Sequence, residues 1–398
     1  MSAVQVNKVD LTAPPVAQKI QQRSLAVGVV AGLVALMAAI MQPQQFYPAY
    51  LLAFMAWLGV TLGCMAILML QHMTGGTWGL IIRRILEAGM RTLPLMAVLF
   101  IPILIGLPRL YEWSRPEAVA KDQHLQMLSR AYLNFDGFLA RAIMYFAIWG
   151  ILLYFLDRWS AQQDAEHTLD ISRRLRMISG PGLVLYAFAM SFAAIDWVMS
   201  LSPHWISTIY PLIFVAGQGL SALAFSVVIE DILFAYKPMA ELLRPNEVHD
   251  HGKLILTFVM LWAYFSFSQW LIIWAGNLPE EISWFVRRLT GGWGYIGLVL
   301  AVFHFAVPFV LLLSRSFKRD VHRLVWLAVW LMLMRGTDLF WMIEPNFHDR
   351  FQVSVWDIVL LFAIGGFWFA LFFRHLHSRP LLHLHDPHTR EILEPAHE

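Results

Sequence analysis

The chain has 398 residues, of which 59% are hydrophobic and 14% are charged, and its mean hydropathy is +0.59. This composition excludes an ordinary soluble domain and predicts an integral membrane protein. The net charge of +2 is too small to indicate a nucleic-acid partner, and a single cysteine, Cys64, excludes an internal disulfide, an iron–sulfur cluster held by this chain alone and a CxxCH haem attachment.

Ten apolar runs of membrane length predict an all-α protein. The runs are continuously apolar and lack the alternation of barrel strands, so they indicate helices. Residues 1–23 are polar and do not resemble a signal peptide, and residues 374–398 form a polar, His-rich tail. The predicted spans are 24–41, 48–70, 92–107, 137–156, 181–200, 206–234, 253–275, 293–313, 324–343 and 355–373.

The segment Thr77–Thr92 precedes the third and weakest span. Its aliphatic residues alternate with Arg83, Arg84, Glu87 and Arg91. This pattern predicts an amphipathic helix that lies in the membrane interface.

The distribution of Lys and Arg predicts the orientation of the chain. Most of these residues lie at the two termini and in the loops after the second, fourth, sixth and eighth spans. Because cytoplasmic loops carry an excess of Lys and Arg, both termini are expected in the cytoplasm.

In this orientation the buried ionisable groups gather in the outer half of the membrane, while the inner half is expected to be comparatively dry. A charged group inside a span is costly, so each is a candidate functional residue. The candidates for proton transfer or catalysis are Asp196, His204, His304, Arg335, Asp338 and Asp357.

The pair Asp196 and His204 is the strongest candidate, as a proton acceptor with a titratable partner. The alternative is a structural role, in which Asp196 pairs with Arg335 or Arg141. Arg335 and Asp338 share one helix face and can neutralise each other, and a lone histidine such as His304 is commonly a hydrogen-bonded core residue.

Aromatic residues and histidines allow further hypotheses. The many tryptophans are expected to act mainly as lipid-facing anchors, but Trp197, Trp205 and Gln269 could line a quinone pocket. Haem is not expected, because His304 has no second histidine at its depth. The tail histidines His375, His377, His383 and His385 are expected to be solvated rather than to bind metal.

A faint repeat relates the fifth and ninth spans. Asp196 precedes Pro203 by the same spacing that separates Asp338 from Pro345. Since these spans are four apart, two four-helix units, at about 48–200 and 206–343, could be related by duplication.

The stretch DWVMSLSPHWISTIY, from Asp196 to Tyr210, resembles a signature of an NrfD-like membrane subunit of bacterial alternative complex III, a quinol:cytochrome c oxidoreductase. The family pattern has an acidic residue in place of Ser202 and a glycine in place of Pro211. The resemblance covers about residues 24–373. Supporting matches lie in 78–88, 252–269, 277–281 and 304–319.

The resemblance implies two four-helix bundles flanked by two further helices, in a subunit of the bacterial inner membrane without haem or an iron–sulfur cluster of its own. It further implies a paralogous NrfD-like partner, periplasmic subunits with iron–sulfur clusters and c-type haems, and in some cases a terminal oxidase. Quinol would bind in this chain or only in the paralogue, in which case this chain provides a proton path or scaffold. The alternative function, outside the family, is a proton-coupled transporter or a non-redox scaffold.

Overall fold

The computed structural model describes residues 12–165, 169–236 and 245–383, together with Asp386 and Thr389. Within these residues ten helical segments are long and apolar enough to cross a membrane, and no strand occurs. The predicted all-α, ten-span membrane architecture is therefore confirmed.

Several spans are longer than their apolar runs, because polar turns extend α2, α3, α10, α11 and α13. Three consecutive helices make up the third span, and a π-helical turn interrupts the eighth. The spanning helices are α2 (Pro15–Met41), α3 (Pro43–Thr74), α4 (Thr77–Met90) with α5 (Leu93–Leu99) and α6 (Ile101–Ile105), α10 (Phe135–Ala165), α11 (Leu169–Trp197), α12 (Tyr210–Phe234), α13 (Pro245–Gly276), α15 (Trp293–Val299) with η4 (Leu300–Ala306) and α16 (Val307–Leu313), α18 (Val321–Ile343) and α19 (Val355–His377).

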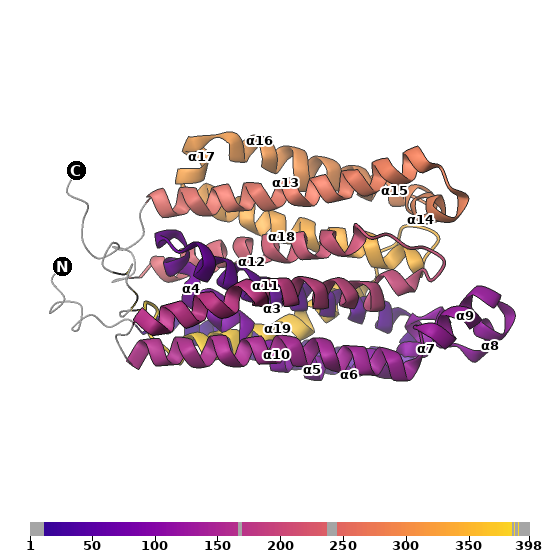
Figure 1. Cartoon of the computed structure of the whole chain (residues 1–398), viewed down its shortest axis with the longest axis horizontal. Helices are drawn as coiled ribbons and strands as arrows, with labels where there is room; N and C mark the ends of the chain where they lie inside the picture. Colours follow the sequence, from indigo (N-terminus) through magenta and orange to yellow (C-terminus); the bar gives the residue numbers. More distant parts are fainter. Residues whose placement is uncertain (1–11, 166–168, 237–244, 384–385, 387–388, 390–398) are drawn as a thin grey trace.

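The bundle has two distinct ends (Figure 1). We call the end at which α2 begins and α19 ends the terminal end, and the opposite one the far end. Short helices lie at the far end, except α17, which joins α16 to α18 at the terminal end. The short helices are α7 (Leu107–Leu110), η1 (Glu112–Ser114), α8 (Pro116–Lys121), α9 (Gln123–Ala131), η2 (Met199–Leu201), α14 (Pro279–Leu289), α17 (Arg315–Arg319) and η5 (Glu344–Asn346).

Helices α3 and α12 form the centre of the bundle and pack against each other. Gly63 of α3 makes this contact close, since a Cβ atom at this position would lie 2.1 Å from the backbone oxygen of Gln218. Small residues allow helices in a membrane to approach closely, where hydrophobic exclusion from water gives no driving force.

The two outer helices, α2 and α19, pack against each other along their length. Their contact is built on Gly28 and Gly366: a Cβ atom on Gly28 would lie 2.8 Å from the backbone nitrogen of Phe367, and one on Gly366 would lie 2.4 Å from that of Gly28. These are the two helices expected to flank the predicted bundles.

The prediction of an interfacial helix at 77–92 is wrong. Helix α4 is buried from Gly79 to Met90, including Arg83, Arg84 and Glu87, and it packs against α3, α12, α13 and α19. A helix lying on the membrane surface would keep its charged face in water. Instead α4 begins the third span, because partners distant in sequence neutralise its charges.

Candidate functional site

A pocket of about 610 Å³ opens between α3, α12, α18 and α19 and extends to the far end of the bundle. Its lining is mostly aliphatic and aromatic, and several lining residues, including Leu333, Ile358 and Phe362, are exposed on the outer surface of the bundle. In a membrane this surface faces lipid. The pocket therefore has the size and apolar character of small-molecule sites, with an entrance from the hydrocarbon.

Arg335 contributes a buried guanidinium to the wall of this pocket. Its Nη1 pairs with a carboxylate oxygen of Asp338, which also accepts a hydrogen bond of 3.0 Å from Nε1 of Trp262. Gly217 makes room for the guanidinium, since a Cβ there would lie 2.3 Å from Cζ of Arg335. The charge is thus held in place by α12, α13 and α18 together.

Asp357 lies on the same wall, in the first turn of α19. One carboxylate oxygen accepts the backbone N–H of Ser354 at 2.8 Å in a capping box, while the other has no hydrogen-bond partner among the described residues. The buried carboxylate of Glu344 interacts electrostatically with Asp357. The pocket thus combines a cation, a carboxylate with a free oxygen and a second acid nearby.

His304 lies beside this group rather than in the pocket. It sits in the π-helical turn η4, and its ring stacks on Trp262 with centroids 4.1 Å apart. Neither ring nitrogen has a hydrogen-bond partner of ordinary geometry among the described residues. Since Trp262 also binds Asp338, the structure brings His304, Asp338 and Arg335 into one cluster, and π-helical turns frequently mark functional positions.

Asp196 occupies a different environment, in the first predicted bundle. Its carboxylate accepts two hydrogen bonds from the Arg141 guanidinium, at 2.8 and 3.1 Å, and one of 2.8 Å from the hydroxyl of Tyr145. The structure therefore agrees with the alternative prediction, in which Asp196 forms a structural pair with Arg141. Tyr132 supports it by placing its ring 3.7 Å from Cζ of Arg141.

His204 does not contact Asp196. It is 53% exposed and pairs with Asp122 at 3.1 Å, while its ring stacks on His124 with centroids 4.9 Å apart. Desolvation would raise the pKa of Asp122, but the backbone N–H groups of Leu125 and His124 hold it below its ordinary value. The predicted Asp196–His204 constellation is thus two separate ion pairs.

The three residues predicted to line a quinone pocket lie in separate packing environments. Trp197 is buried against Phe100, with ring centroids 4.7 Å apart, and Trp205 stacks on Trp284 at the same spacing. Gln269 accepts a hydrogen bond from Ser207.

The tryptophans do not act mainly as lipid-facing anchors. The exposed ones are Trp270, Trp274, Trp326 and Trp330. Those buried inside the protein are more numerous: Trp113, Trp149, Trp197, Trp205, Trp262, Trp284, Trp293 and Trp368.

The expectation of a dry inner half is wrong. At the terminal end, Glu87 is buried among Arg83, Arg84, Ser160 and His383, with contacts of 3.1, 2.7, 2.7 and 3.0 Å respectively. The two arginines have further acidic partners, Asp386 for Arg83 and Asp164 for Arg84. We call this group the Glu87 network. No local sequence pattern predicts the Glu87 network, because its members come from α4, α10 and the chain after α19.

The Glu87 network also corrects the prediction of a solvated tail. His383 is fully buried, and burial together with the nearby Arg83 and Arg84 holds its pKa well below the ordinary value. His377 donates a hydrogen bond of 2.6 Å from Nδ1 to the backbone oxygen of Phe373 in α19. His385 lies outside the described residues. The described part of the chain contains no group of three or more acidic, His or Cys side chains that could hold a metal ion.

A second buried pair lies at the terminal end, where Nδ1 of His251 approaches a carboxylate oxygen of Glu230 at 3.0 Å and Nε2 lies 2.7 Å from the backbone oxygen of Trp78. Glu230 lies near the end of the predicted sixth span, but its side chain is buried between α12 and α13.

The fold defines the class of this protein: it is a polytopic, all-helical membrane protein with an apolar pocket that opens on the outer surface of the bundle. No family model matches the chain, and no curated protein is similar to it.

Proposed function

We propose that this protein is the membrane subunit of a quinol-oxidising respiratory complex and that quinol binds in the Arg335–Asp357 pocket. The observation that carries the proposal is the combination of a guanidinium and a carboxylate on the wall of an apolar pocket that opens to lipid. A quinol is a flat ring with a long apolar tail, so the ring would enter the pocket while the tail remains in the bilayer.

Asp357 would accept a proton from the quinol hydroxyl through its free carboxylate oxygen, since a general base must lie within hydrogen-bond reach of the proton it removes. Arg335 would donate a hydrogen bond to the quinol oxygen and stabilise negative charge that develops there. Asp338 and Glu344 would complete a route for protons toward the far end of the bundle.

The electrons require other subunits, and the resemblance to alternative complex III names their class. In that assembly a paralogous membrane subunit and periplasmic subunits with iron–sulfur clusters and c-type haems surround this chain. The excess of Lys and Arg at the terminal end supports a bacterial inner-membrane location with both termini in the cytoplasm. The far end would then face the periplasm, on the side of the electron carriers.

The first test is purification of the tagged chain from its native membrane in gentle detergent, followed by an optical spectrum and peptide identification. We expect haem c absorbance and a second ten-span subunit. A colourless, solitary protein would refute the proposal.

Within the purified complex, Asp357→Asn should lower quinol oxidation by about 100-fold or more, the usual range for loss of a general base. Asp349→Asn is the matched control, because Asp349 is an exposed far-end carboxylate that does not line the pocket. A photoreactive quinone analogue should label the segments 335–340 and 351–362. Equal activity of the two variants, with labelling elsewhere, would exclude this pocket.

One observation favours the alternative of a proton-coupled transporter. Buried polar groups occur at both ends of the bundle, and the π-helical turn η4 breaks a span near its middle. Transport would require proton flux through liposomes that contain the isolated chain, whereas a subunit of a quinol-oxidising complex requires no such flux.

A further inference from the structure

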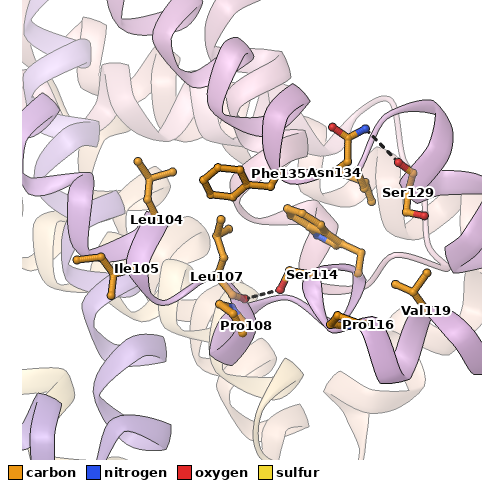
Figure 2. A pocket seen from close by; sticks show the side chains of 12 residues that line it. Leu104, Ile105, Leu107, Pro108, Ser114, Pro116, Val119, Ser129, Asn134 and Phe135 are labelled. Carbon is orange, nitrogen blue, oxygen red and sulfur yellow. Dashed lines mark hydrogen bonds between the residues drawn. The ribbon is translucent and has the colours of Figure 1, made fainter.

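A second pocket lies at the far end, where the third span leaves the membrane and the fourth enters it. Its volume is about 440 Å³, and its walls come from α6, α7, η1, α8, the end of α9 and the beginning of α10 (Figure 2). Leu104, Ile105, Leu107 and Phe135 form its membrane side, and Val119 contributes to the other side.

The polar side chains in this wall already have partners. The hydroxyl of Ser114 donates to the backbone oxygen of Leu107 at 2.9 Å or of Tyr111 at 2.8 Å. The amide of Asn134 donates to the backbone oxygen of Ser129 at 3.0 Å and accepts from the N–H of Gly137 (Figure 2). The pocket therefore offers a largely apolar surface to an occupant.

Trp113 is the exception among the polar side chains of this wall. Its side chain lines the pocket and is 3% exposed, yet its Nε1 has no hydrogen-bond partner among the described residues. An indole N–H can only donate, and buried donors are rarely left unpaired. An occupant of this pocket should thus combine an apolar body with an acceptor oxygen.

The pocket is continuous with the lipid-facing surface. Ile105 is 68% and Phe135 54% exposed, and both mark the ends of their spans at the far end. Exposed apolar residues of the same spans, such as Val98 and Ile143, continue this surface toward the middle of the membrane. The opening therefore lies at the boundary between acyl chains and headgroups.

Basic residues adjoin the lining positions. Arg109 follows Pro108 and Arg130 follows Ser129, and both residues are exposed. Arg115 instead lines a neighbouring hollow and donates to the backbone oxygens of Pro108 and Arg109 at 2.8 and 3.2 Å. Segment 106–134 carries more Lys and Arg than all other far-end connections together. Its acidic residues Glu112, Glu117 and Asp122 line a neighbouring hollow and not this pocket.

We propose that this pocket is a structural binding site for one glycerophospholipid of the surrounding bilayer. An acyl chain fills the apolar cavity, an ester carbonyl accepts the Trp113 N–H, and the phosphate lies near Arg109 and Arg130. The site is distinct from the Arg335–Asp357 pocket and does not depend on the proposed function. Its role is to fix segment 106–134 against the membrane surface.

Native mass spectrometry of the full chain tests this proposal. The protein is delipidated in detergent and titrated with phosphatidylglycerol. We expect one tightly retained lipid in the unaltered chain and none with Val119→Trp, which fills the cavity from outside the spans. Trp113→Phe keeps the aromatic packing and should weaken retention by about 2- to 10-fold, as expected for one neutral hydrogen bond.

Trp326→Phe is the matched control, because Trp326 is 77% exposed on the lipid-facing surface and lines neither pocket. Circular dichroism and a single symmetric gel-filtration peak establish that each variant is folded. Equal retention by all four proteins would overturn the proposal, and so would selective retention of a quinone in place of the phospholipid.

Discussion

Replacement of Glu87 by Gln tests whether the Glu87 network stabilises the fold. The carboxylate receives hydrogen bonds from Arg83 and Ser160 on one oxygen and from Arg84 on the other, and His383 lies at 3.0 Å. The substitution keeps the shape but removes the charge and turns an amide group toward arginine donors. Removing one partner of a buried ion pair lowers the free energy of unfolding by about 3–5 kcal/mol, because the remaining charge stays buried without a partner.

The assay can use the only cysteine. Cys64 is fully buried in α3, so a thiol-reactive fluorescent dye reports its exposure as the purified protein unfolds in detergent. Each kcal/mol of lost stability lowers the midpoint of thermal unfolding by roughly 2 °C. Glu87→Gln should therefore lower the apparent midpoint by about 6 °C or more. Since such unfolding is usually irreversible, all variants are compared at one heating rate.

Asp250→Asn provides the control at the same end of the bundle. Asp250 pairs with Lys253 at 2.8 Å, but both side chains are largely exposed, and exposed pairs contribute about 0–1 kcal/mol. The midpoint of thermal unfolding of the Asp250→Asn variant should hardly change. If Glu87→Gln and Asp250→Asn shift the midpoint equally, the network does not stabilise the fold and our reasoning is wrong.

Three further predictions follow from the geometry. Gly217→Ala should displace Arg335 and lower quinol oxidation, whereas Gly150→Ala, where a Cβ meets nothing within 4 Å and which does not line the pocket, should not; equal rates would contradict the assigned position of the guanidinium. Because the folded-state pKa of His383 is lowered, its stabilising contribution is complete above about pH 6.5 and decreases as the pH falls toward the folded-state value. Proteolysis of the C-terminal segment should therefore be faster at pH 5 than at pH 7.5, and His383→Gln should remove this difference. Gly366→Val should separate α2 from α19 and lower the thermal midpoint, while Gly150→Val, at an open position, should not.

The spans were predictable because apolar length is a local property of the sequence. The predicted span 355–373 corresponds to α19, and 324–343 to α18, with small changes at the ends. The third span was misjudged for a physical reason. Arg83 and Arg84 make α4 resemble a surface helix, and only their contacts with Asp164 and Asp386 show that the charges are neutralised inside the bundle.

The candidate site was predictable only in part. Buried charges identified Arg335 and Asp357, because an ionisable group within a span is conspicuous. Their common pocket depends on the packing of α3 against both α18 and α19, which no local pattern encodes. Glu344 was missed because it lies where the ninth span ends, a position at which an acid is ordinarily solvated. The partition into two four-helix bundles stays a prediction.

The packing of α12 distinguishes proton release at the far end from transport across the membrane. Between Gln218 and Glu230 this helix passes from the Arg335 cluster to the terminal end, and its buried side chains there are mostly apolar. Ser221 and Ser226 donate to carbonyls of α12 itself, so they offer no continuous relay. Asp357, by contrast, lies in the first turn of α19 and is close to the far-end surface. A proton taken from quinol at this position has a short exit, whereas one crossing the bundle along α12 would pass a dry stretch. The proposed quinol oxidation needs only this short exit, whereas proton-coupled transport along α12 would need a relay that its described serine side chains do not form.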